Sequence, residues 1–141
     1  MIYVIDASVV LKWFLREQAS DAADLLFEKF LSNKIELLAP DCLIQEVANT
    51  LWKQSILLKR LRPEDSLAIL RDFQTLPLNL QPSTLLVNKA LDLAIKFRHP
   101  VYDMLYCALA IENDCEFVTS DKVLVAKLAG PLPFIRLLTA V

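Results

Sequence analysis

The sequence predicts a single α/β domain over residues 1–141, in which a parallel sheet is covered by helices on both faces. Short apolar segments typical of strands alternate with longer segments in which apolar residues recur at helical spacing. The first of these segments, residues 2–5, is apolar throughout, as expected of a strand buried on both faces. The chain has 141 residues, of which 55% are hydrophobic, and this is enough to form one generous core.

The first half of the chain contains two predicted strands, each followed by two helices. Pro40 ends the second strand, and Pro63 begins a helix whose first turn carries Glu64 and Asp65, where the helix dipole favours acids. The expected elements are strand 2–5, helices 9–15 and 19–31, strand 35–39, and helices 41–58 and 63–75.

In the second half of the chain, predicted helices and strands again follow one another, and breaks that contain proline or glycine separate some of them. His99 and Pro100 separate two helices, and Gly130 with Pro131 precedes the last strand. The expected elements are a short strand or extended link 76–80, helices 83–97 and 101–113, strand 116–119, helix 121–128 and strand 134–138.

The composition excludes several kinds of site. The formal net charge is −2, so no overall basic field attracts nucleic acid. Gly130 is the only glycine, which excludes the glycine-rich phosphate loops of nucleotide-binding folds. His99 is the only histidine, which excludes a histidine-rich zinc site and leaves a Ser-His-Asp triad dependent on this one residue.

The cysteines and the apolar segments indicate a cytoplasmic protein without a membrane anchor. Cys42, Cys107 and Cys115 form no CxxC pair and are odd in number, as expected of reduced cysteines. Asp6 and Lys12 interrupt the early apolar run, so we expect no signal peptide, and no apolar stretch is long enough to span a membrane.

Four acids occupy comparable places in the predicted fold. Asp6 and Asp121 follow apolar strands, whereas Glu46 and Asp103 lie in early turns of helices. Each alone is explained by helix capping or by an exposed surface position. In a parallel sheet, however, all four could meet at the edge formed by the carboxyl ends of the strands.

Four carboxylates at one edge need a cation, because each raises the pKa of its neighbours. Oxygen ligands favour a hard divalent ion, so we expect Mg²⁺ or Mn²⁺, as one or two ions. Such a site acts on phosphates by activating water and stabilising the attacking and leaving oxygens.

Three segments and one glutamate resemble the PIN-domain ribonucleases, and most closely the VapC-type toxins of toxin–antitoxin pairs. They are residues 3–13, which contain Asp6, residues 102–110, which contain Asp103, residues 118–121, and Glu46. The resemblance covers essentially the whole chain. It implies a Rossmann-like α/β/α sandwich with a central parallel sheet, and a metal-dependent endoribonuclease that cleaves RNA.

The resemblance also implies roles for individual residues and partners. Asp6 and Asp103 would be the principal metal ligands, and Ser8 and Thr119 would support them. The complete catalytic and metal-binding quartet would be Asp6, Glu46, Asp103 and Asp121. The family's usual partners are a small antitoxin protein and a second copy of the chain in a homodimer. The one departure from the family pattern is Ser120, at a position that varies.

Other functions remain alternatives. A haloacid-dehalogenase-like phosphatase needs a second acid where this chain has Ser8, and a receiver domain needs paired acids after the first strand. A catalytically silent interaction module with the same fold would not require all four acids. Three basic residues either line an RNA groove or belong to the solvated surface: Lys12, Arg16 and Lys122.

Overall fold

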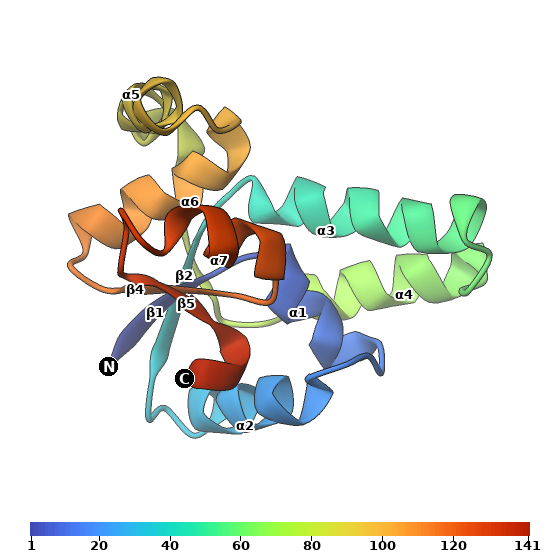
Figure 1. Cartoon of the computed structure of the whole chain (residues 1–141). Coiled ribbons are helices and arrows are strands. Elements are labelled where there is room, and N and C mark those ends of the chain that lie inside the picture. Colours follow the sequence, from blue (N-terminus) through green and yellow to red (C-terminus); the bar gives the residue numbers. More distant parts are fainter. The chain divides into compact units, whose positions relative to one another are not determined.

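Five strands form one parallel sheet with the order β3-β2-β1-β4-β5 (Figure 1). The structure is a computed structural model that describes residues 1–141. The strands are β1 (Ile2–Ile5), β2 (Glu36–Pro40), β3 (Asn79–Gln81), β4 (Glu116–Thr119) and β5 (Ile135–Leu137). The predicted central parallel sheet is therefore confirmed.

The chain divides into two compact bodies. The first comprises Met1–Asp41 and Leu78–Val141 and contains the whole sheet, and the second comprises Cys42–Pro77.

Strand β1 is the central strand of the sheet in the first body. Val4 pairs with Leu38 of β2 on one side and with Phe117 of β4 on the other. Val4 and Ile5 are fully buried, as expected of a strand covered on both faces. The carboxyl end of β1 is thereby held in the middle of one edge of the sheet.

Helices cover both faces of this sheet. With this strand order, crossovers of the usual right-handed kind put the helices between β1 and β2 on one face and those after β3 on the other. Figure 1 shows α2 on the side opposite α6 and α7. Helix α6 contacts β1, β2 and β4, and α5 packs on α6. The helices are α1 (Ala7–Phe14), α2 (Ser20–Leu31), α5 (Val87–Phe97), α6 (Val101–Glu112) and α7 (Lys122–Leu128), and two 3₁₀ turns are η2 (Ser83–Leu85) and η3 (Leu138–Ala140). The α/β/α arrangement expected from the sequence is confirmed.

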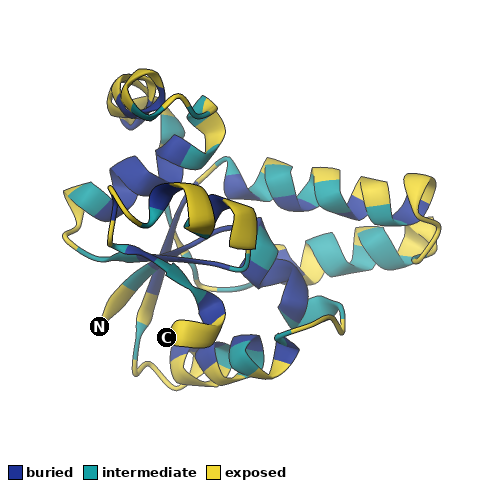
Figure 2. Ribbon diagram, viewed as in Figure 1, coloured by how far each residue is buried: buried dark blue, intermediate teal, exposed yellow.

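The core of the first body lies where α6 meets the sheet. Every residue of α6 from Met104 to Ala110 is buried (Figure 2), and Tyr106 stacks on Phe117 of β4 with ring centroids 5.5 Å apart. On the α1–α2 side, Trp13 packs against Phe27 and donates a hydrogen bond of 3.0 Å to the carbonyl of Ala23.

The second body is a pair of helices. It contains α3 (Leu43–Trp52), a π-helical turn η1 (Lys53–Leu57) and α4 (Pro63–Gln74). The single helix predicted over 41–58 therefore changes character at Lys53. At this turn the Ser55 hydroxyl donates to the carbonyl of Leu51 at 3.0 Å and contacts the Ser66 hydroxyl of α4, so side-chain hydrogen bonds accompany the change in helix type.

Two other boundaries differ from the sequence prediction. The strand expected over 76–80 forms at Asn79–Gln81, because Pro77 lacks the N–H that a sheet ladder requires. The helix expected from Ser83 begins as a 3₁₀ turn and becomes α-helical at Val87. None of the helices combines the length and apolar character needed to cross a bilayer.

We expect Phe117→Ala to lower the free energy of unfolding by about 3–5 kcal/mol, because it leaves a cavity under Tyr106 in a fully buried layer. Urea unfolding measures this change. Val123→Ala, at a side chain that is 77% exposed, is the control and should change it by less than about 0.5 kcal/mol. Equal, small changes in both variants would contradict this account of the core.

Candidate active site

Asp6 lies at the carboxyl end of β1 and is the N-cap of α1. Its Oδ1 accepts hydrogen bonds from the Ser8 backbone N–H at 3.1 Å and the Ser8 hydroxyl at 2.5 Å. Its Oδ2 accepts one from the Thr119 hydroxyl at 2.6 Å. The residue is only 8% exposed. The helix cap expected from the sequence is real, but it accounts for only part of these contacts.

The Asp6 carboxylate is linked through hydroxyls to the segment that follows β4. Ser8 Oγ accepts a hydrogen bond of 2.8 Å from the Ser120 N–H, and Thr119 Oγ1 accepts one of 3.1 Å from the Asp121 N–H. The two hydroxyls themselves lie 3.3 Å apart. Ser8 and Thr119 therefore bind Asp6 and also connect the ends of the adjacent strands β1 and β4.

The pKa of Asp6 is raised from 3.8 to about 6, chiefly because the carboxyl is buried; hydrogen bonds from Ser8 and Thr119 oppose the rise, and the negative charge of Asp103 adds to it. A buried carboxylate next to a second carboxylate is an unfavourable arrangement for an anion. A bound cation would relieve it by favouring the ionised form.

Asp103 lies in the first turn of α6, with its side chain 39% exposed. Its Oδ2 is 2.6 Å from Nε2 of His99. Lys127 Nζ lies 3.0 Å from Nδ1 of the same imidazole and donates to the carbonyl of Arg98 at 2.9 Å. An ammonium can only donate, so Nδ1 accepts and Nε2 carries the proton that is donated to Asp103.

His99 is not among the residues that the sequence predicted for this site. The sequence placed it in the break between two helices and indicated a role for it only as the base of a triad. The signal that could have found it is the spacing, because His99 precedes Asp103 by four residues at the start of a helix.

Asp121 is the N-cap of α7. Its Oδ1 accepts hydrogen bonds of 3.0 Å from the N–H groups of Val123 and Leu124, and the residue is exposed. The capping interpretation is thus confirmed for Asp121. Its backbone N–H, through Thr119, belongs to the same network as Asp6.

Glu46 is half-buried in the first turn of α3 and belongs to the second body. The structure therefore brings Asp6 and Asp103 within electrostatic reach of each other and ties the backbone of Asp121 to Asp6. The described side chains form no ready-made cluster of three or more His, Cys, Asp and Glu ligands. The full quartet stays a prediction.

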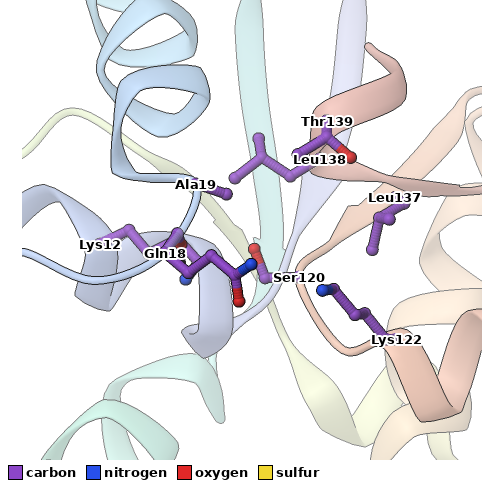
Figure 3. Close-up of a pocket in the computed structure, with 8 residues that line it drawn as sticks. All are labelled: Lys12, Gln18, Ala19, Ser120, Lys122, Leu137, Leu138 and Thr139. Atoms are coloured by element: carbon purple, nitrogen blue, oxygen red, sulfur yellow. Dashed lines mark hydrogen bonds between the residues drawn. The ribbon is translucent and has the colours of Figure 1, made fainter.

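Two of the three basic residues singled out in the sequence line one cavity. Lys12 and Lys122 face a cavity of about 360 Å³ (Figure 3). Arg16 instead forms ion pairs with Asp21 at 3.0 Å and Asp24 at 2.7 Å on the surface.

The fold and the site together define a class of protein, namely an α/β protein with carboxylates at the carboxyl edge of a parallel sheet. Residues 3–130 match the sequence model of the PIN domain, and the chain belongs to this family. The predicted family resemblance is therefore confirmed.

Two similar proteins are from Pyrobaculum aerophilum. The chain is 32% identical over 133 residues to "Ribonuclease VapC3" of Pyrobaculum aerophilum, covering 90% of this chain and 95% of that protein. It also resembles the crystal structure of PAE2754 from Pyrobaculum aerophilum, with a TM-score of 0.65 and 21% identity, covering 99% of this chain and 91% of the other. The structural likeness supports the fold.

We expect the metal-free protein to lose stability as the pH rises from about 4 to 7 because of Asp6. Between pH 3.8 and about 6 the folded protein keeps a proton on Asp6 that the unfolded chain releases, so the free energy of unfolding falls through this window. The gap between the two pKa values corresponds to roughly 3 kcal/mol. Asp6→Asn should remove this loss.

Urea unfolding in EDTA at pH 4 and pH 7.5 measures the difference. Asp92→Asn, at an exposed carboxylate on α5, is the matched control and should follow the wild-type protein. If the stability of Asp6→Asn depends on pH in the same way as that of the wild type, Asp6 does not have a raised pKa in the folded protein.

Proposed function

We propose that the protein is a divalent-metal-dependent endoribonuclease and the toxin of a toxin–antitoxin pair. The observation that carries this proposal is the carboxylate of Asp6, which is buried at the end of the central strand, held by two hydroxyls and raised in pKa with a contribution from Asp103. Such a carboxylate favours the binding of a divalent cation. A cation at this edge of the sheet could in turn bind the phosphodiester of a substrate.

The relationship to a named ribonuclease supports the choice of RNA as substrate. The similarity to Ribonuclease VapC3 extends over 95% of that protein, so the alignment includes nearly all of its domain. The match to the PIN domain runs through both bodies, from residue 3 to residue 130, which supports the expected single domain over residues 1–141.

The acidic residues fit Mg²⁺ or Mn²⁺, because carboxylate oxygens are the ligands that these hard ions prefer. Asp6 and Asp103 would be the principal ligands, and Glu46 and Asp121 would complete the site, with one or two ions. A divalent ion supplies an activated water and stabilises negative charge on the phosphate oxygens.

The protein's own groups would hold this site in place. Ser8 and Thr119 donate to opposite oxygens of Asp6, which fixes the plane of the carboxylate. His99 donates to one oxygen of Asp103 and leaves the other available. Hydrogen bonds of this kind orient metal-binding carboxylates and commonly change metal affinity or activity by 10- to 100-fold.

The proposed protein partners are a small antitoxin and a second copy of the chain. The second body has an apolar cavity of about 310 Å³ lined by residues of α3, η1 and α4. Trp52, Ile56 and Leu67 beside it are each about half exposed. Apolar surface of this kind is typical of a protein-binding site and supports the expectation of a protein partner.

We expect the purified protein to cleave single-stranded RNA in Mg²⁺ or Mn²⁺, and Asp6→Asn or Asp103→Asn to lower the rate by at least about 100-fold, because each removes a proposed metal ligand. Excess EDTA should stop the reaction. Gel analysis of a 5′-labelled RNA measures the rate, and circular dichroism checks that each variant is folded.

Asp92→Asn provides the matched control, since it makes the same chemical change at an exposed position. Full activity of either active-site variant, or cleavage that survives EDTA, would refute the metal site. A wild-type protein that cleaves no RNA but binds a protein partner would favour the silent interaction module. Hydrolysis of phosphomonoesters instead of RNA would favour the phosphatase.

We expect His99→Ala to lower the rate of RNA cleavage by about 10-fold or more and His99→Gln to retain most of it. The amide nitrogen of glutamine can occupy the position of Nε2 and donate to Asp103, whereas alanine cannot. The Mg²⁺ concentration for half-maximal rate should rise in His99→Ala and return toward the wild-type value in His99→Gln. Unchanged metal dependence in His99→Ala would show that His99 does not position Asp103.

A further inference from the structure

The cavity of about 360 Å³ in the first body has no role in the site described so far. It lies beside the carboxyl ends of β4 and β5 (Figure 3), and its size falls in the range of small-molecule sites. Polar and apolar side chains from separate parts of the chain face it. They include Lys12, Gln18, Ser120, Lys122, Leu137 and Thr139.

This cavity, the Lys12–Lys122 pocket, adjoins Asp6 through two hydrogen bonds. The N–H of Ser120, a residue that lines it, donates to Ser8 Oγ at 2.8 Å. The Ser8 hydroxyl in turn donates to Asp6 Oδ1 at 2.5 Å. A ligand in the pocket would therefore lie next to the phosphate-cleaving site.

Two ammonium groups, those of Lys12 and Lys122, face the pocket. The side chain of Lys12 is only 9% exposed, and its Nζ donates to the Gln18 carbonyl at 2.5 Å and lies 3.4 Å from the Glu17 carboxylate. An ammonium has three N–H groups, so one remains for a ligand. Lys122 is exposed, has no carboxylate within salt-bridge distance, and directs its nitrogen toward Ser120 (Figure 3). The Glu17 carboxylate offsets the charge of Lys12, so the net positive charge at the pocket comes from Lys122, and it favours an anionic ligand.

The other residues that line the pocket are of the kinds that contact a nucleobase. Leu137 is half-buried and offers an apolar surface, and Gln18 and Thr139 place an amide and a hydroxyl at the rim. The Ser120 hydroxyl is buried without a hydrogen-bond partner.

We propose that the Lys12–Lys122 pocket binds one nucleotide of the RNA, next to the bond that is cleaved, and so sets the base preference at that position. Lys12 and Lys122 hold its phosphate, Leu137 packs against the base, and Gln18 and Thr139 contact the edge of the base. This inference rests on the proposed ribonuclease function, but RNA binding tests it without cleavage.

The first test measures binding of a fluorescein-labelled single-stranded RNA decamer by fluorescence anisotropy. EDTA is present so that no metal ion contributes to phosphate binding. We expect Lys122→Ala to raise the Kd by about 3- to 10-fold and to lower the slope of log Kd against log salt by about 0.7, the value for one lost phosphate contact on a single strand. Thr139→Trp, which fills the pocket from an exposed position, should raise the Kd by more than about 10-fold.

Lys89→Ala is the matched control, because it removes the same charge from an exposed position on α5. It should leave the Kd and the salt slope unchanged. If Lys89→Ala weakens binding as much as Lys122→Ala, the lysines act only through overall charge and the pocket is refuted. Wild-type affinity in Thr139→Trp would refute it as well.

The second test maps the cleaved bonds in a mixed-sequence RNA. Gln18→Ala should change the base preference at one position beside the cleaved bond by about 5-fold, and an unchanged cleavage pattern would overturn the assignment. Nucleoside monophosphates serve as a further probe by NMR. If they occupy the pocket while the decamer does not, the pocket is a free-nucleotide site and the RNA assignment is wrong. RNA binding that depends on Lys122 in a protein that cleaves no RNA would support the pocket and overturn the proposed function.

Discussion

The burial of the Asp6 carboxylate is the constraint on which the rest of the site depends. The central position of β1 removes this group from water, and that burial is the main cause of its raised pKa. Hydrogen bonds from neighbouring elements offset part of the cost, chiefly those from Ser8 at the start of α1 and Thr119 at the end of β4. Strand order, helix start and strand end therefore have to agree for this one side chain to be tolerated.

Much of the fold could be predicted from the sequence because the alternation of apolar strands and amphipathic helices is strong. The apolar run at residues 2–5 correctly predicted a strand buried on both faces, and the helices began and ended within a few residues of proline and glycine signals. The π-helical turn at Lys53 could not be predicted, because it accompanies hydrogen bonds from Ser55 to its own helix and to Ser66 of α4. Periodicity in one helix carries no information about such contacts.

The candidate site could be predicted in its residue types but not in its burial. Asp6 and Asp121 both follow an apolar strand, yet the structure buries Asp6 and exposes Asp121 as a helix cap; Asp103, in the first turn of a helix, is half-exposed. These differences depend on which strand lies in the centre and on how each helix leaves the sheet. His99 was missed because its interaction with Asp103 requires a particular side-chain rotamer at a helix start, which spacing only suggests.

The pairing of β1 with β4 has a consequence for how the protein is made. Asp6 is translated early, but the hydroxyl that donates to its Oδ2 belongs to a residue 113 positions later. Until Thr119 has left the ribosome, the nascent chain cannot pair β1 with β4 or complete the hydrogen bonds around this carboxylate. Assembly of the aspartate site is therefore a late event in synthesis, and a chain interrupted before β4 carries its first acid without the partners that hold it.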